Sequence, residues 1–180
     1  MILQGIDPYR GHSSSLGNRL CVLYRESYMC SIQDKPAPVS HIHTWRVLLL
    51  RLFGAQNGRG CHIYPCIKVW TPWNLKMGSH SGVKDGAYLY CMDKIETGDY
   101  VAISQGTALC GGTHDYNSSN LQLVVKPIVI GTHAWTRADA FLHPGVFVPE
   151  GAVVGARSVV TKSLDLPWGD LNGQSCKKDQ

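Results

Sequence analysis

The chain has 180 residues, 44% of them hydrophobic, which is enough for one domain with a core of its own. Its 17 Lys and Arg against 13 Asp and Glu give a formal charge of +4, too small and too dispersed to indicate a nucleic-acid partner. The longest aliphatic run, residues 47–50, is far shorter than a membrane span. Composition and charge therefore exclude a transmembrane protein and a nucleic-acid-binding protein.

The N-terminal residues and the cysteines bear on the compartment. The first thirty residues contain charged side chains at five positions and no continuous apolar stretch, so we expect no secretory signal. Seven cysteines without a C-x-x-C pair fit neither a disulfide framework nor a zinc ribbon, and the closest pair, Cys61 and Cys66, has no second pair. We therefore expect reduced thiols, no metal and a cytoplasmic location.

Residues 1–60 are expected to form an N-terminal arm with one short helix. Residues 1–40 show no single period, which predicts irregular structure. Between His41 and Phe53 apolar residues recur at helical spacing, and Gly54 ends the pattern. We expect this helix to pack its stripe onto the domain that follows, while attachment to a membrane surface, which would be peripheral, is the alternative. The stripe consists of Trp45, Leu48, Leu49, Leu52 and Phe53, beside Arg46 and Arg51.

Residues 61–180 are expected to form a second unit, and they carry a six-residue period. An exposed strand alternates with period two and a helix repeats every 3.6 residues, so neither explains it. Six residues suit a short strand and a tight turn, with one inward side chain per strand and a small residue at the corner. The period therefore predicts a parallel β-helix. The inward positions are Ile130, Thr136, Leu142, Val148, Val154 and Val160, and the small ones are Ala134, Ala140, Val146, Ala152 and Ser158.

The same period runs upstream in registers that are offset by two residues. The series occupy residues 63–75, 77–95 and 97–109, the first being the weakest. Each two-residue slip predicts a local bulge. The period is lost between His114 and Val129, where turn-forming residues occur, so residues 115–129 are expected to leave the solenoid as a loop. Loops carried on rigid repeats are where function tends to lie.

The repeat motifs resemble a known family. The sequences IGTHAW at 130–135, PGV at 144–146 and GAVVGARSVVTK at 151–162 resemble the hexapeptide-repeat acyltransferases, and the closest branch is the sugar O-acetyltransferases of maltose and galactoside type. Within that branch, FGA at 53–55, PWNL at 72–75, ISQ at 103–105 and HDY at 114–116 resemble the colanic acid biosynthesis acetyltransferases. The resemblance covers residues 45–178.

This resemblance implies an all-β fold, a left-handed parallel β-helix, whose handedness the period alone does not give. It also implies a homotrimer with each active site in a groove between neighbouring subunits. The implied activity is acetyl-CoA-dependent O-acetylation of a hydroxyl on a sugar or a lipid-linked oligosaccharide in bacterial exopolysaccharide biosynthesis. A short C-terminal tail would follow the solenoid.

The candidate catalytic residue is His114. Moving an acetyl group from a thioester to a hydroxyl needs a base with a pKa near 7, for which histidine is suited. His114 follows Gly-Gly-Thr at the expected end of a repeat strand, and the family's catalytic histidine occupies this motif position. Asp115 could orient the ring or merely cap the loop. Direct transfer needs no covalent acyl-enzyme, so Cys110 is expected to be structural.

The resemblance also implies a set of contacts to coenzyme A. The tryptophan would wall the groove, and the lysines would meet phosphates. Three positions depart from the family pattern: Arg137, His143, and the terminal sequence GQSCK at 173–177, which lacks the family's proline. The implied contacts are Trp135, Ala138, Ala156, Thr161, Lys162 and Lys177.

Two other functions remain open at the level of sequence. One is a noncatalytic hexapeptide-repeat scaffold, against which the presence of His114, Trp135 and Lys162 argues. The other is a metalloenzyme like the gamma-type carbonic anhydrases, which bind metal through three histidines, two of them five positions apart. No such spacing occurs in the expected solenoid. The sequence therefore favours the acetyltransferase.

Overall fold

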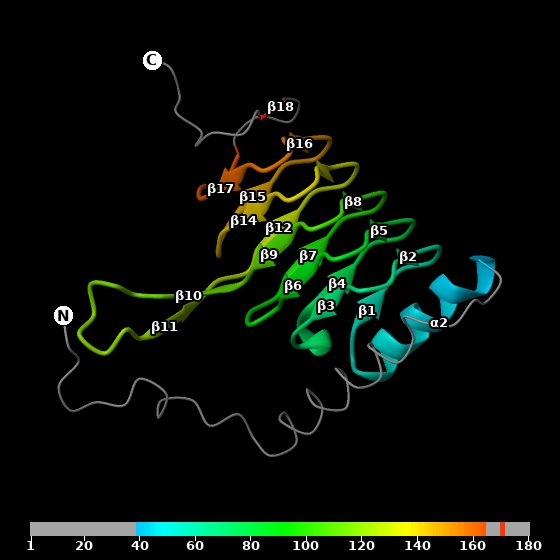
Figure 1. Ribbon diagram of the computed structural model, residues 1–180, viewed down its shortest axis with the longest axis horizontal. Helices are drawn as coiled ribbons and strands as arrows, with labels where there is room; N and C mark the ends of the chain where they lie inside the picture. Colours follow the sequence, from blue (N-terminus) through cyan, green and yellow to red (C-terminus); the bar gives the residue numbers. More distant parts are fainter. Residues whose placement is uncertain (1–38, 165–169, 172–180) are drawn as a thin grey trace.

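The computed structural model describes residues 39–164 and 170–171 (Figure 1). Helix α2 (Val39–Leu52) comes first, and short strands follow it to the end of the described chain. Irregular structure was expected over residues 1–40; residues 39 and 40 already belong to α2, and residues 1–38 lie outside the described residues, as does the candidate contact Lys177. The boundary near residue 60 between two units stays a prediction.

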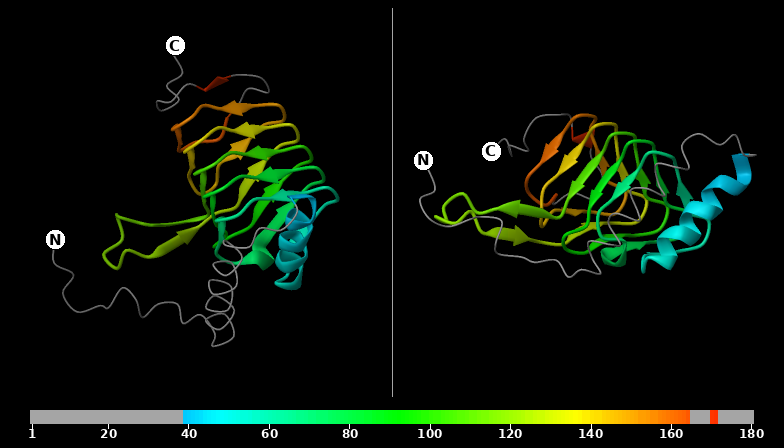
Figure 2. Two further views of the ribbon diagram at one scale, coloured as in Figure 1. Left: turned by 45° about the vertical axis from the view of Figure 1, so that its right-hand side comes forward. Right: turned by 60° about the horizontal axis from the view of Figure 1, so that its bottom comes forward.

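Three parallel sheets form the sides of the solenoid, and the strands from β1 to β9 and from β12 to β17 belong to the three sheets in turn, so the chain winds as a parallel β-helix (Figure 2). Sheet A contains β1 (Gln56–Asn57), β4 (Leu75–Met77), β7 (Ile95–Thr97), β12 (Ile128–Ile130) and β15 (Phe147–Val148). Sheet B contains β2 (His62–Ile63), β5 (Gly82–Val83), β8 (Ala102–Ile103), β13 (Trp135–Thr136), β16 (Val153–Val154) and β18 (Asp170–Leu171). Sheet C contains β3 (Lys68–Val69), β6 (Tyr88–Tyr90), β9 (Ala108–Cys110), β14 (Phe141–Leu142) and β17 (Val159–Val160).

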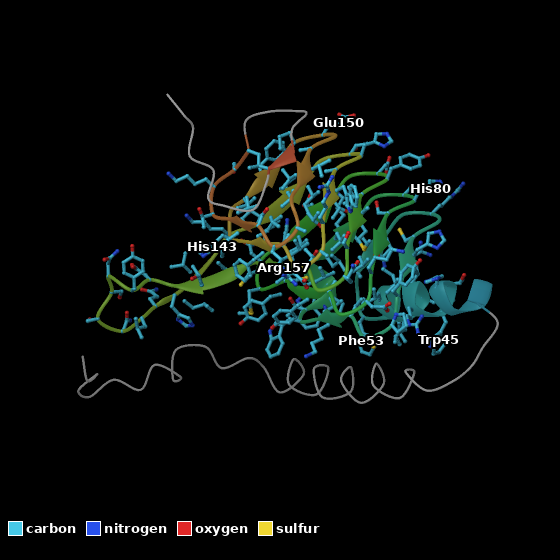
Figure 3. All side chains as sticks on the ribbon, turned by 45° about the horizontal axis from the view of Figure 1, so that its top comes forward. Trp45, Phe53, His80, His143, Glu150 and Arg157 are labelled. Atoms are coloured by element: carbon cyan, nitrogen blue, oxygen red, sulfur yellow. The ribbon has the colours of Figure 1, made fainter. Side chains whose placement is uncertain are left out.

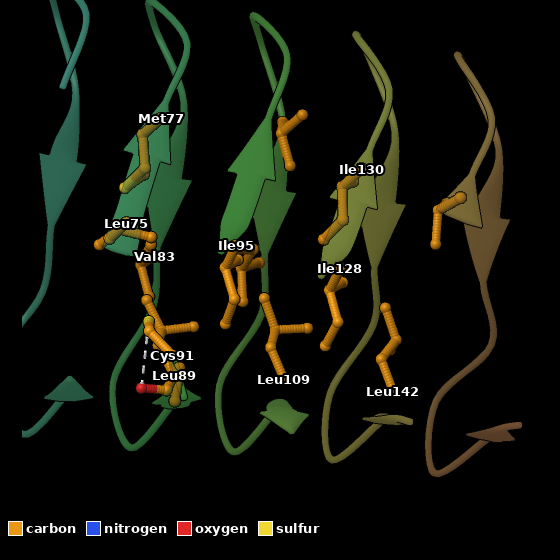
Figure 4. Packing of buried hydrophobic residues seen from close by; sticks show 14 of the residues in the cluster. Leu75, Met77, Val83, Leu89, Cys91, Ile95, Leu109, Ile128, Ile130 and Leu142 are labelled. Atoms are coloured by element: carbon orange, nitrogen blue, oxygen red, sulfur yellow. Dashed lines mark hydrogen bonds between the residues drawn. The ribbon is translucent and has the colours of Figure 1, made fainter. Parts of the chain in front are cut away.

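The core consists of side chains stacked in columns along the inside of the three sheets (Figure 4). The six predicted inward residues from Ile130 to Val160 are each at most 2% exposed. The five small corner residues from Ala134 to Ser158 are at most 5% exposed. The prediction from the six-residue period is therefore confirmed. Burial of these aliphatic columns supplies the main favourable contribution to folding.

The two-residue slips fall inside strands of sheet A, because both outer residues of β4, Leu75 and Met77, and both outer residues of β7, Ile95 and Thr97, point inward. Strands β4 and β7 pair residue by residue from Leu75↔Ile95 to Met77↔Thr97, with no unpaired residue. The strands of the early coils are longer: β6 and β7 have three residues each, whereas β14 and β15 have two each. The predicted bulges are therefore wrong. A bulge would leave backbone groups unpaired against the next coil, whereas residues two apart in a regular strand both point inward without disturbing the ladder.

The first coil is as complete as the later ones. Its inward residues Ile63, Val69 and Leu75 are at most 1% exposed, although their repeat was the weakest in the sequence. Helix α2 packs on β1 and β2 at this end of the solenoid (Figure 1). The helix therefore covers the open end of the inner columns.

The buried face of α2 differs from the predicted stripe. Of the stripe residues only Leu49 is buried, and Trp45, Leu48 and Leu52 are exposed. The solenoid instead covers Val47, Leu50 and Arg46, whose guanidinium lies 3.5 Å from the Ile63 carbonyl. Burial lowers the pKa of Arg46 from its ordinary value. The predicted face is therefore wrong, because an arginine can bury its apolar stem, and a pattern of apolar residues counts it as polar.

The segment expected to leave the solenoid does so as a β-hairpin. Strands β10 (Gly112–His114) and β11 (Leu123–Val125) pair antiparallel and project from the corner between sheets C and A (Figure 1). Departure from the solenoid is confirmed, but the excursion begins earlier than predicted and has regular structure. A Cβ at Gly111 would lie 2.8 Å from the Tyr90 carbonyl oxygen, so this tight exit requires glycine.

Among the described residues, no helix combines the length and apolar character that crossing a bilayer requires.

Candidate active site

His114 lies on the projecting hairpin and is exposed. It is the last residue of β10, whereas the repeat strand β9 already ends at Cys110. The expectation that His114 follows a repeat strand directly is therefore wrong.

The imidazole of His114 is held by a backbone group. Its Nδ1 lies 2.7 Å from the carbonyl oxygen of Leu121, which adopts a left-handed conformation with φ of 47°. A carbonyl can only accept, so Nδ1 carries the hydrogen and Nε2 keeps its lone pair. The geometry therefore fits a histidine that accepts a proton at Nε2.

Asp115 caps the turn of the hairpin. Its Oδ1 accepts a hydrogen bond of 2.9 Å from the backbone N–H of Asn117, which is a typical Asx turn. The Asp115 N–H donates to the Gln122 carbonyl at 2.9 Å. Of the two roles that the sequence left open, the structure supports the cap, because the His114 ring is oriented by Leu121.

Trp135 lies on the outer side of sheet B and is 42% exposed. Its Nε1 donates to the Ser104 hydroxyl at 2.8 Å, and the Arg137 guanidinium lies 4.9 Å from its ring centroid. A hydrogen bond and a cation–π contact therefore hold the ring on the solenoid surface. Arg137, one of the departures from the family pattern, covers part of the indole.

Neither Arg137 nor His143, the two described residues that depart from the family pattern, disturbs the hydrogen-bond ladder between coils. The Arg137 N–H donates to the Val154 carbonyl at 3.0 Å, and the His143 N–H donates to the Val160 carbonyl at 2.9 Å. The His143 ring contacts Phe141 edge-on at a centroid separation of 5.9 Å. Both side chains are thus accommodated on the outside of regular coils.

Ala138 and Ala156 occupy the same corner, between sheets B and C, in successive coils. The N–H of Arg157, next to Ala156, donates to the Ala138 carbonyl at 2.9 Å. Ala156 is exposed and Ala138 is half-buried. Their small side chains leave the backbone of this corner open to an extended ligand. The exposed ion pair between Arg157 and Asp139, 3.6 Å long, flanks it.

Thr161 and Lys162 follow β17, close to the end of the described solenoid, and both are exposed. The next residue, Ser163, accepts a hydrogen bond of 3.0 Å from the Phe147 N–H, which ties this segment to the preceding coil. The ammonium of Lys162 is thus carried on an anchored segment and is accessible to an anion.

Within the part of the chain that the structure describes, the thiols show no sign of nucleophilic activation. Cys110 donates to the Gly112 carbonyl at 3.1 Å, and burial raises the pKa of the Cys61 thiol. Cys61, Cys66, Cys91 and Cys110, the cysteines of the described residues, are not joined in disulfide bonds. Within residues 39–164 and 170–171, no three His, Cys, Asp or Glu side chains are grouped so that they could hold a metal ion.

A single chain does not gather these residues around one cavity. His114 projects from the corner between sheets C and A, while Trp135 lies on sheet B and Ala138 lies between sheets B and C. The hairpin extends away from its own solenoid (Figures 1 and 2). His114 and the candidate donor residues therefore lie on different sides of the described solenoid.

Sequence reasoning missed two adjoining hollows on the outer side of sheet A. They have volumes of about 350 and 200 Å³ and share Gln56 and Lys76. Arg51 lines the first, and Trp73 and Lys94 line the second. Outward residues carry no periodic signal in a solenoid, because only inward positions are constrained by packing. The hairpin and the paired Lys76 and Glu96, at 3.7 Å, were likewise not predictable from the period.

No family model matches the chain. The putative colanic acid biosynthesis acetyltransferase WcaF of Escherichia coli (strain K12) is 44% identical over 123 residues, which are 68% of this chain and 68% of that protein. A putative acetyltransferase of Staphylococcus aureus (strain Mu50) is 35% identical over 109 residues, 58% of this chain and 54% of that one.

Solved structures share the fold. A hexapeptide-repeat acetyltransferase from Vibrio cholerae superposes with a TM-score of 0.74 at 22% identity, over 92% of each chain. Galactoside acetyltransferase in complex with coenzyme A superposes with a TM-score of 0.73 at 21% identity, over 85% of this chain and 76% of that one.

The left-handed parallel β-helix is confirmed, and it is the architecture of the hexapeptide-repeat acetyltransferases. The chain belongs to this family, together with the colanic acid biosynthesis acetyltransferase WcaF.

Proposed function

We propose that the protein is an acetyl-CoA-dependent O-acetyltransferase that modifies a hydroxyl of a sugar or a lipid-linked oligosaccharide in bacterial exopolysaccharide biosynthesis. The observation that carries this proposal is the His114 ring, exposed on the hairpin with Nδ1 bound by the Leu121 carbonyl. The name of the 44% identical relative supports the pathway, and the coenzyme A held by structures of this fold supports the donor.

In this mechanism Nε2 of His114 removes the proton from the acceptor hydroxyl as its oxygen attacks the thioester carbonyl. The new C–O bond forms and the C–S bond breaks, and the imidazolium returns the proton to the departing thiolate. The Leu121 carbonyl fixes the tautomer and stabilises the positive charge on the ring. Cys110 takes no part in the transfer.

The donor would lie along the corner formed by Ala138 and Ala156. Their small side chains let an extended pantetheine arm approach the backbone, and the Trp135 ring forms a wall. Thr161 and the exposed ammonium of Lys162 would meet the phosphate end, with Lys177 as a further contact. The acceptor is expected at the hairpin, within reach of His114.

We further propose a homotrimer whose active sites are shared. His114 lies at one corner of the solenoid and the donor residues at another, so a hairpin from one subunit would complete the site on its neighbour. Closed cyclic symmetry repeats this contact three times. The expected mass is three times 19.8 kDa by light scattering, and a monomeric mass at micromolar concentration would contradict the trimer.

The test of the activity compares two variants of neighbouring residues. His114→Ala should lower kcat by roughly 10²-fold or more, the effect of losing a positioned base, while calorimetry still detects coenzyme A binding. Cys110→Ala should retain most of the activity. A dead cysteine variant together with an active histidine variant would mean a covalent thioester route and would overturn the mechanism.

The shared site is tested by mixing subunits. His114→Ala and Ala156→Trp, which fills the donor corner, should each be inactive alone. Refolding the two together should restore activity, because mixed trimers contain sites with an intact hairpin and an intact donor corner. Activity that is no higher than in either variant alone would contradict a site built from two subunits.

The noncatalytic scaffold is the alternative. It predicts no binding of coenzyme A by calorimetry and no loss of thioester with any sugar acceptor. A cytoplasmic location remains part of the proposal, and cell fractionation tests it.

A further inference from the structure

Helix α2 exposes an apolar face that its contacts with the solenoid do not cover. Trp45, Leu48 and Leu52 are 48%, 52% and 81% exposed, and their spacing of three and four residues places them on one side of the helix. The opposite side packs on β1 and β2 through Val47 and Leu50. Figure 3 shows Trp45 on α2 at the end of the solenoid. We call these three residues the outer face of α2.

The charges are not dispersed along the chain as we expected from the composition, because basic residues are concentrated around α2. Residues 35–84 contain seven Lys and Arg and no Asp or Glu, whereas residues 85–180 contain seven Lys and Arg and ten Asp and Glu. The basic segment comprises α2 and the first coil of the solenoid up to β5. Arg51 on the last turn of α2, and Arg59 and Lys68 on the first coil, are all exposed. The net charge of +4 therefore conceals a cationic end and an acidic remainder.

We propose that the outer face of α2 docks on an anionic phospholipid bilayer, with the helix lying in the interface. Leucine and tryptophan side chains on a basic helix are suited to the boundary between headgroups and acyl chains. The cations of the first coil face the negative surface potential of the membrane. The helix has 14 residues, so it lies on the bilayer and does not cross it.

The charge also argues against a second copy of this chain as the partner that covers the outer face of α2. A self-complementary contact through α2 would bring two cationic ends together, and like charges across an interface oppose association. Nucleic acid would satisfy the cations but would leave Leu48 and Leu52 against a polar surface. An anionic bilayer satisfies both the apolar face and the charge. This inference does not depend on the proposed activity.

The experiment is sedimentation of the full chain with vesicles. We expect binding to phosphatidylcholine vesicles that contain about one third phosphatidylglycerol, little binding to pure phosphatidylcholine, and weaker binding as salt rises. Equal binding to both vesicles, or to neither, would overturn the proposal.

Matched variants assign the contact to the helix. Trp45→Ser with Leu48→Ser should lower the vesicle affinity at least about tenfold. Phe147→Ser with Val159→Ser removes apolar side chains of nearly equal exposure, 46% and 52%, from other coils and should leave the affinity unchanged. Equal effects of the two pairs, or a change of oligomeric mass caused by the α2 pair alone, would overturn the proposal, the latter because a second copy would then cover the face.

The charge is tested in the same way. Arg59→Gln with Lys68→Gln should weaken binding to anionic vesicles several-fold, and Lys94→Gln with Lys126→Gln, outside the basic segment, should not. Thermal unfolding of each variant checks that the exposed substitutions leave the fold intact. A dependence on salt that is identical in both pairs would contradict a membrane contact through this end.

Discussion

The first and last parts of the solenoid build the same cross-section with coils of different length. In the early coils, paired residues of sheet B such as Gly82 and Ala102 lie 20 residues apart in the sequence. In the late coils, the paired residues Trp135 and Val153 lie 18 residues apart. The difference falls on the path from the inward residue of sheet C to the last inward residue of sheet A, where the strands of the early coils are longer. From Leu89 the chain needs eight residues to reach the inward Thr97, but from Leu142 it needs six to reach Val148. The ladder therefore tolerates variation on this path only.

The hairpin is the extreme case of the same variation. Ala102 and Trp135 pair across 33 residues, and the excursion occupies the path that is already longer in the early coils. The sheets on either side stay in register. A segment that carries the candidate base has thus been added where the solenoid accepts length, and the core beneath it is unchanged.

The strongest test of this contrast removes core side chains from both kinds of coil. Leu89→Ala in a long coil and Leu142→Ala in a short one should each lower the free energy of unfolding by about 2–5 kcal/mol, because both leucines are fully buried in one column. Leu123→Ala on the half-exposed hairpin should cost less than about 1 kcal/mol. Denaturant unfolding measures all three, and an equally large loss at Leu123 would mean that the hairpin belongs to the core.

A second prediction concerns the path that differs. Val146 lies directly before β15, two residues before Val148, just as Ile128 lies two residues before Ile130, the partner of Val148, and Ile95 two residues before Thr97. Val146→Ile should lower the free energy of unfolding by about 1–3 kcal/mol, because the shorter path has no room for another methylene. Ile95→Val should cost about 0.5–1.5 kcal/mol. If Val146→Ile stabilised the protein, the shorter path would not be the tighter one.

The smallest expected effect on stability is at Thr97, the second inward residue of strand β7. Thr97 is 6% exposed, and its buried hydroxyl has no hydrogen-bond partner. Thr97→Val should raise the free energy of unfolding by about 1 kcal/mol. Thr136 is the control, because its hydroxyl lies 3.4 Å from the Ala102 carbonyl, and Thr136→Val should give no gain. Equal melting shifts for the two would contradict this reasoning.

The inward columns were predictable because packing imposes one side chain every six residues. Other features depend on contacts that no period records. The orientation of His114 is set by a carbonyl seven residues away, at Leu121, across the turn of the hairpin. The apolar spacing predicted the wrong buried face for α2, because Arg46 is buried with its guanidinium near the Ile63 carbonyl. In both cases a single polar contact decides the geometry, and apolar spacing carries no information about it.

The closure of the hairpin has a consequence for chain entropy. Lys126 N–H donates to the Gly111 carbonyl at 3.1 Å, so the chain leaves and re-enters the solenoid at one point. Lengthening a closed loop from 20 to 33 residues costs only roughly 0.4 kcal/mol, because loop entropy grows with the logarithm of length. The entropic cost of pairing one coil with the next is therefore nearly the same as it would be in a solenoid without the hairpin. The order in which coils zip together during folding should be almost insensitive to the length of this arm.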